Sequence, residues 1–200
     1  MNANDRKGLV RESKEQVVSM IEGARDVANA ITDAVSNIVA RAVKGTRDVG
    51  GELVGLIVDT VTGSVHAAAE VGSEIGMAAK SIMIGTLRGT RQVGTAGLET
   101  IRTSAAAVIK GVASVGGSVA DAARGTVEGA IEAARDLGVS AEEAASAAGS
   151  GIVQAAGEVS STALEQVQGV LTQAISGVKV VLAEPFRSGS RDEGRAPARG

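Results

Sequence analysis

Apolar and polar residues follow a helical spacing along this chain, and the whole pattern recurs every 22 residues. Within one unit, aliphatic residues stand four positions apart, as Val27, Ile31, Val35, Val39 and Val43 show. Steps of three and four residues predict an amphipathic α-helix and not a strand. Eleven residues make three helical turns at about 3.67 residues per turn, so a period of 22 keeps one face of a helix aligned.

Seven such units cover residues 24–177, and a weaker eighth unit covers residues 2–23, where Leu9, Val17 and Ile21 stay in phase. Because loops usually disturb the phase of a helical pattern and no insertion interrupts this one, the simplest prediction is an all-α chain with one long amphipathic helix and no sheet. A parallel β-helix can also have coils near 22 residues, but the four-residue spacing and the alanine content disfavour it.

A helical hairpin is the alternative to one continuous helix. Gly138 is suited to end a helix, and Ser140 with Glu143 three residues later forms a capping box that would start the next one. A weaker break is predicted at 116–117, where two glycines precede Ser118 and Asp121. A turn at either place would fold the helix back on itself.

The ends of the chain depart from the repeat. Residues 1–23 form a charged N-terminal segment, and residues 178–183 are the predicted end of the helix. Pro185 stops a helix because its nitrogen donates no hydrogen bond. Residues 184–200 are rich in Arg and Gly, which predicts a disordered tail.

The predicted functional surface is the apolar stripe of the helix, an arc of roughly 130° on the helical wheel. We expect this face to bind a surface or a partner helix. Its members are Val27, Ile31, Val43, Val49, Leu53, Val65, Val71, Ile75, Leu87, Val93, Ile109, Val115, Val119, Ile131, Leu137, Val153, Val159 and Ile175.

Basic residues line one border of this stripe, where long side chains can lie along apolar matter and keep their charged ends in water. This predicted basic border comprises Arg25, Arg47, Lys80, Arg91, Arg102, Arg124 and Arg135.

Small residues lie at the centre of the stripe and in several Gly-x-x-x-Gly pairs. The first residues of the units are mostly Ala or Thr, a pattern that favours close helix contact and that lipid does not require. The glycine pairs are 51/55, 72/76, 85/89 and 125/129. The 22 glycines of the seven units cost a helix roughly 20 kcal/mol relative to alanine. The helix therefore needs a surface that accepts its stripe: lipid, another helix of this chain or another copy.

Few residues could support catalysis or bind a metal ion. The chain has no Cys, one His and one aromatic residue. His66 stands at a polar position of the repeat and is expected on a solvated face. Glu142 and Glu143 diverge by about 100° on a helix and are expected to act at a helix start. We predict no enzyme activity, no cofactor and no metal.

Charge and hydropathy narrow the partners. The net charge of −3 gives no electrostatic footprint for nucleic acid. The longest uncharged run, residues 144–157, is too short and too rich in small residues to span a membrane. The N-terminus has no apolar signal segment. We expect a cytoplasmic protein, peripheral on a membrane or lipid body, and a homo-oligomer is possible within the same pattern.

The repeat over residues 24–177 resembles the 11- and 22-residue helical repeats of synucleins, perilipins and exchangeable apolipoproteins. The segments GTVEGA at 125–130, VGGSV at 115–119 and TRDVGG at 46–51 are similar to synuclein repeats. Phasins, which coat storage granules with Ala-rich helices, are a looser analogue. The resemblance implies an interfacial helix that is largely disordered when free, although the Lys-rich core of synucleins and the proline punctuation of apolipoproteins are absent.

The leading prediction is a structural coat whose helix adsorbs to a lipid or granule surface. The alternative is a self-assembling scaffold, either a right-handed coiled coil or a helical bundle. A third hypothesis is a desiccation or stress protectant. It is disfavoured because the 11-residue repeats of such proteins are far more charged than this chain, in which 22% of the residues are charged.

Overall fold

The computed structural model describes residues 23, 25–44, 51–94 and 97–182. One helix covers residues 25–44, and six more follow. These are α2 (Gly51–Glu70), α3 (Ile75–Gln92), α4 (Leu98–Ser114), α5 (Val119–Leu137), α6 (Ala141–Val159) and α7 (Ser161–Leu171). The all-α prediction is confirmed for this part of the chain, which contains an isolated bridge but no extended strand.

The prediction of one continuous helix is wrong. The chain reverses direction at glycines with left-handed backbone, and the φ angles are 70° at Gly72, 74° at Gly94, 70° at Gly116 and 72° at Gly138. Glycine adopts this conformation without a steric cost. These four turns stand 22 residues apart, and each of the helices α2 to α6 that they bound has 17 to 20 residues. The apolar pattern keeps its 22-residue spacing through the turns because one helix and its turn together make up 22 residues.

Each reversal closes with hydrogen bonds that satisfy the last carbonyl groups of the helix. After α2, the Ser73 amide donates to the Ala68 carbonyl at 2.9 Å and the Gly72 amide donates to Ala69 at 3.1 Å. This pair of bonds is the Schellman arrangement. The bond from an amide to the carbonyl five residues earlier recurs at the end of α4, where the Gly117 amide donates to the Val112 carbonyl at 3.0 Å.

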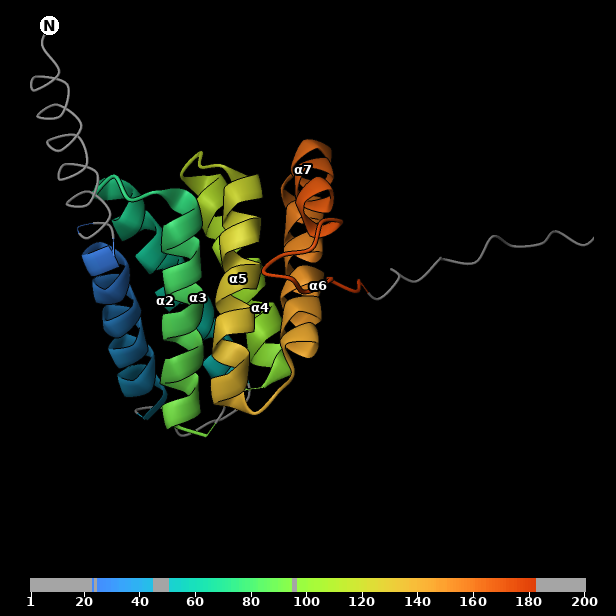
Figure 1. Cartoon of the computed structure of the whole chain (residues 1–200). Helices are drawn as coiled ribbons and strands as arrows, with labels where there is room; N and C mark the ends of the chain where they lie inside the picture. The colour runs from blue at the N-terminus through green and yellow to red at the C-terminus, as the bar shows by residue number, and fades with distance from the viewer. Residues whose placement is uncertain (1–22, 24, 45–50, 95–96, 183–200) are drawn as a thin grey trace, which may run out of the picture.

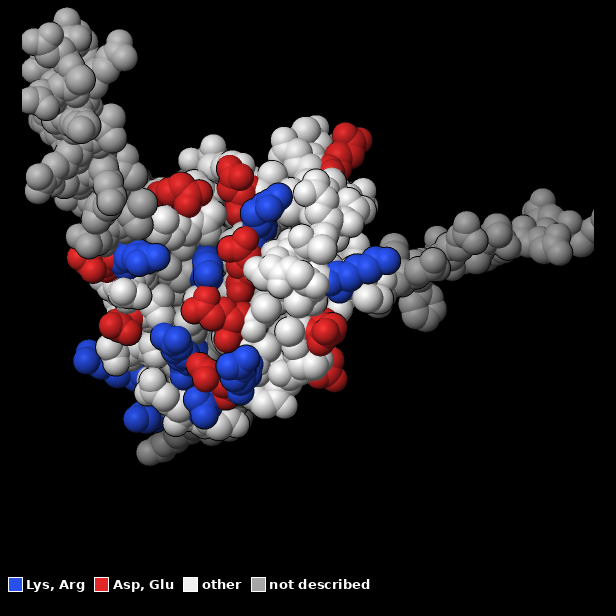
Figure 2. Space-filling model, viewed as in Figure 1, with Lys and Arg blue, Asp and Glu red and all other residues white. Residues whose placement is uncertain are grey.

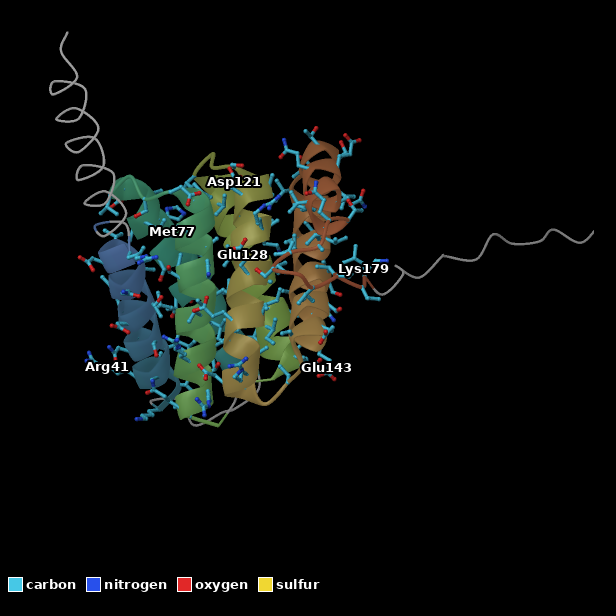
Figure 3. The ribbon with its side chains drawn as sticks, in the orientation of Figure 1. Arg41, Met77, Asp121, Glu128, Glu143 and Lys179 are labelled. Carbon is cyan, nitrogen blue, oxygen red and sulfur yellow. The ribbon has the colours of Figure 1, made fainter. Side chains whose placement is uncertain are left out.

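Side-chain caps then start the next helix. The Glu74 carboxylate accepts from the amides of Gly76 and Met77 at the start of α3. Ser118 accepts from the Asp121 amide, and Ser140 and Glu143 form a complete capping box. Both breaks predicted from the sequence are therefore confirmed. Figure 3 shows Asp121 and Glu143 at opposite ends of the array, as expected for the first turns of antiparallel neighbours.

The helices pack chiefly against the helix two places away in the chain. α2 packs on α4, α3 on α5 and α4 on α6, and α3 also contacts the 25–44 helix. The result is two layers, one with the 25–44 helix, α3 and α5, and the other with α2, α4 and α6 (Figure 1). Because consecutive helices are antiparallel, helices within one layer run parallel.

The last described residues cover one end of this array. α7 packs on α5 and α6 and ends at Leu171, earlier than the helix end predicted at 178–183. Ile175 and Val178 then exchange two backbone hydrogen bonds of 2.9 Å around a tight turn. Ile175 and Val180 are buried, and Val180 lies over Gly149 of α6.

Several predictions fall outside the described residues. These are the charged N-terminal segment at 1–22, Arg47, Val49 and the tail at 184–200, and the side chain of Leu53 also lies outside them.

Candidate functional site

The predicted apolar face lies mostly between helices. Two of its aliphatic residues, Leu87 and Ile109, are completely shielded from solvent. The other buried members are Val65, Val119 and Ile175. The half-buried members are Ile31, Val43, Ile75, Val93, Val115, Ile131, Leu137 and Val153. Val27, Val71 and Val159 are exposed. The stripe thus supplies much of the contact between helices of this chain.

The 22-residue columns correspond to positions in the packed array. In one column, every residue from the 25–44 helix to α7 is at most 2% exposed, whatever its size. Its members are Val35, Ile57, Ala79, Ile101, Ala123, Ala145 and Val167. The column of small residues at the predicted stripe centre is also buried, at Ala68, Thr90, Val112, Ala134 and Ala156. Small residues here let neighbouring helices approach closely.

Glycines on each helix receive the backbone of the helix two places earlier. A Cβ at Gly85 would lie 2.6 Å from the Thr32 carbonyl oxygen, and one at Gly129 would lie 2.7 Å from that of Lys80. A Cβ at Gly151 would come closer still to the Arg102 carbonyl oxygen. Such distances are shorter than side chains tolerate, so these three positions require glycine.

The predicted glycine pairs divide between contact and turn. Gly85 and Gly89 lie against the 25–44 helix, and Gly125 and Gly129 lie against α3. Nothing lies within 4 Å of a Cβ built at Gly55, and Gly72 is a turn residue.

Part of the basic border forms polar contacts between helices of the same layer. Lys80 Nζ lies 2.9 Å from Glu132 Oε2, and the residues one unit later, Arg102 and Gln154, are joined by a 3.3 Å hydrogen bond. Figure 2 shows acidic and basic side chains interleaved over α3 and α5. These contacts fix the register of parallel helices at a modest gain in stability because they are exposed.

A second ion-pair column repeats in the same way. Arg88 Nε lies 3.7 Å from Asp136 Oδ2, and one unit later Lys110 Nζ lies 2.6 Å from Glu158 Oε2. The hydrogen bond from Lys110 holds the pKa of Glu158 below its usual value. Arg91 also reaches Asp136, at 4.0 Å. Arg25, Arg124 and Arg135 are exposed.

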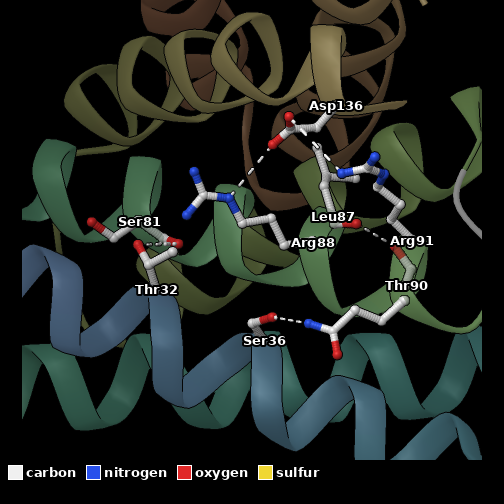
Figure 4. A network of polar contacts seen from close by, with 9 residues as sticks. Thr32, Ser36, Ser81, Leu87, Arg88, Thr90, Arg91 and Asp136 are labelled. Carbon is white, nitrogen blue, oxygen red and sulfur yellow. Dashed lines mark hydrogen bonds and ion pairs between the residues drawn. The ribbon is translucent and has the colours of Figure 1, made fainter. Parts of the chain in front are cut away.

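α3 is fastened to both of its layer neighbours (Figure 4). Two hydrogen bonds join α3 to the 25–44 helix. Thr32 Oγ1 of the 25–44 helix donates to the Ser81 carbonyl of α3 at 3.3 Å, and Gln92 Nε2 of α3 donates to Ser36 Oγ of the 25–44 helix at 3.2 Å. On the other side, Arg88 pairs with Asp136 of α5.

The candidate site is a groove between the 25–44 helix and α2, at the end of the array opposite α7. It has a volume of about 650 Å³. Val27 is 44% exposed, Ile38 is 50% exposed and Val71 is 73% exposed at its walls. Gly63 lies on its floor beside Ala67, with Asp59 as the charged residue of the lining. Such an apolar depression is suited to bind an apolar helix face.

Gly63 belongs to the same column as Gly85, Gly129 and Gly151, yet no atom of the described residues lies within 4 Å of a Cβ built on it. The groove is therefore the position that a helix two places before α2 would occupy. Sequence reasoning missed this site, although Ile38 and Gly63 are visible in the repeat, because the site exists only once the helices are folded into layers.

The remaining candidate groups have structural partners. His66 Nε2 lies 3.0 Å from Ser114 Oγ, which itself donates to the Gly111 carbonyl. Ser140 hydrogen-bonds Glu143 through its amide and hydroxyl and lowers the pKa of that carboxyl group. Within the described ranges, no group of three His, Asp or Glu side chains is placed to hold a metal ion.

No family model, curated protein or solved structure matches this chain. Among the helices described, none combines the length and apolar character needed to cross a membrane.

Proposed function

We propose that this chain is a non-enzymatic helical scaffold that assembles with further copies of itself through the groove between the 25–44 helix and α2. One contrast carries this proposal: no described residue covers Gly63, whereas Gly85, Gly129 and Gly151 of the same column are covered by a neighbouring helix. An array that repeats one mode of packing and leaves one such position open presents a preformed binding surface.

The chemistry of the groove supports a helical partner. Its walls are aliphatic and its floor is glycine and alanine, the combination that accepts helices elsewhere in this fold. Exposed apolar surface of this kind is costly in water and marks interaction sites. Its nearly uncharged lining favours an apolar helix face over a nucleic acid or a strongly charged peptide.

A lipid or granule coat is the second candidate, favoured by the apolar stripe that each helix carries. In the packed array, residues such as Leu87 and Ile109 of this stripe are in contact with other helices. Lipid binding by the stripe would therefore require the helices to separate, as an exchangeable surface protein does. The buried columns and the close glycine contacts oppose that opening.

Two measurements on the full chain separate the candidates. Sedimentation across a concentration series should give a mass above 19.8 kDa that rises with concentration. Circular dichroism should show a helical chain in buffer whose signal changes little on addition of anionic or zwitterionic vesicles. A monomer at all concentrations that gains helicity on vesicles would contradict the scaffold and favour the coat.

A further inference from the structure

The packing rule of this array specifies what belongs in the groove. Within a layer, each helix packs parallel to the helix two places earlier in the chain. The same rule predicts that the open face of α2 accepts a parallel helix, namely the one that directly precedes the 25–44 helix in the repeat. In the sequence, this position corresponds to residues 2–22, which lie outside the described part of the structure.

The register between α3 and α5 indicates which residue of this segment would meet Gly63. A Cβ at Gly129 would lie 2.9 Å from Met83 Cβ, 46 positions earlier, and Gly111 meets Val65 at the same offset, whereas Gly85 meets Val35 of the 25–44 helix 50 positions earlier. The residue 46 positions before Gly63 is Val17. Val17 belongs to the same 22-residue column as Val39, Val61 and Met83, which are at most 1% exposed. Val17 therefore has the column position and the apolar character that the open slot requires.

The described start of the first helix opposes placing this segment in the groove of its own chain. The turn glycines stand at 72, 94, 116 and 138, and the equivalent position before the first helix is Ala28. Ala28 lies inside the helix over residues 25–44, and Gly23 is helical as well. The reversal that precedes α3 to α6 is therefore absent at the equivalent place in this helix.

We propose that residues 2–22 of a second copy fill the groove, so that two copies exchange their N-terminal segments. A two-fold axis perpendicular to the helices inverts the second copy, and its N-terminal segment then runs parallel to α2 of the first. This is the direction that the layer rule requires. Straightening a turn and exchanging the element it connected is a general route to dimers. The inference rests on the proposed assembly function and names the partner and the segment.

Cysteine pairs test the contact directly, because the chain has no native Cys. The double variant Val17→Cys with Gly63→Cys should form a disulfide-linked dimer on oxidation, because the predicted Cβ atoms are neighbours. An equal mixture of the two single variants should form a linked dimer that contains one chain of each kind. Val65→Cys with Gly111→Cys, whose Cβ atoms would lie 3.3 Å apart, should link within one chain and serves as the positive control. Glu15→Cys with Gly63→Cys places the first thiol on the opposite side of a helix and should link poorly.

A matched pair on α2 tests the slot without a cross-link. Gly63→Leu fills the groove floor, whereas Gly55→Leu adds the same side chain to the same helix, away from the groove. Nothing lies within 4 Å of a Cβ at either site, so both chains should fold. We expect wild type and Gly55→Leu to sediment at twice the 19.8 kDa chain mass and Gly63→Leu to sediment as a monomer.

The outcomes distinguish the two proposals. A wild-type dimer that survives Gly63→Leu, or that gives no Val17–Gly63 link while the control pair links, overturns the exchange and leaves the assembly function standing. A Val17–Gly63 link within a single chain overturns the exchange in favour of the chain's own segment. A wild-type monomer across the concentration series overturns both.

Discussion

Gly63 and Gly151 occupy the same position of the repeat, and their surroundings differ completely. Gly151 lies against the backbone of Arg102, whereas nothing in the described part of the chain lies within 4 Å of a Cβ built at Gly63. Ile82 and Ile38 show the same contrast. Ile82 of α3 is fully buried, whereas Ile38, at the equivalent position of the 25–44 helix in the same layer, is 50% exposed. The repeat therefore determines whether a residue is suited to contact a neighbouring helix. The place of its own helix in the array determines whether such a neighbour is present.

The isoleucine pair gives the largest expected difference. Ile82→Ala should lower the free energy of unfolding by about 2–5 kcal/mol because it leaves a cavity in the core. Ile38→Ala removes a half-exposed side chain and should cost less than about 1 kcal/mol under dilute, monomeric conditions. Urea denaturation of both variants measures the difference. Equal losses would mean that the two residues are equally buried in solution.

The glycine pair should change stability in opposite directions. Gly151→Ala forces a Cβ into the Arg102 backbone and should destabilise the fold by about 1–3 kcal/mol. Gly63→Ala meets nothing in the single chain and should stabilise α2 by up to about 1 kcal/mol. Thermal unfolding of the monomeric protein measures both. A stabilising Gly151→Ala would show that α4 and α6 are farther apart than described.

The ion pair between α4 and α6 should contribute much less than either pair above. Lys110 and Glu158 are each about half exposed, and such pairs contribute about 0.2–1 kcal/mol. A double-mutant cycle with Lys110→Ala and Glu158→Ala isolates their coupling energy. The cycle at Lys80 and Glu132, whose charged atoms lie 2.9 Å apart, should give a similar value. A coupling that persists unchanged at high salt would contradict a solvent-screened pair.

The smallest effect concerns pH. The folded state lowers the pKa of Glu143, through its hydrogen bonds from Ser140, and the pKa of Glu158, through Lys110. A lowered folded pKa means that the unfolded chain binds protons more readily, so this stability is fully present above the ordinary value of 4.5 and is lost as pH falls through the folded values. Thermal melts from pH 7 to pH 3 should show this loss, and it should be smaller in Glu143→Gln. An unchanged pH profile in that variant would contradict the assigned cap.

The sequence was sufficient to predict helices, the buried columns and the two breaks at 116–118 and 138–143. It led to the wrong connectivity because a 22-residue period is satisfied equally by six turns of one helix and by a shorter helix with a turn of three to five residues. Gly72 and Gly94 belonged to a column of small residues that a continuous helix also explains. The left-handed φ at these glycines separates the two possibilities, and a pattern of residue types does not contain it.

The groove could not be predicted from the sequence for a related reason. Gly63 differs from Gly85 neither in type nor in spacing, and its exposure depends on how many helices precede it in the layer. The basic border posed the same difficulty. Lys80 and Arg102 fit the description of residues that face a lipid headgroup, but the layers place them beside Glu132 and Gln154.

The covered end of the array gives the stack a polarity. α7 and the turn at Ile175–Val178 occupy the face beyond α5 and α6, and Val180 rests on Gly149, so the described residues cover the end opposite the groove. A module with two complementary ends would join head to tail and grow into a filament without limit. With that end covered by its own chain, the proposed association through the groove would stop at two copies instead of continuing into a filament.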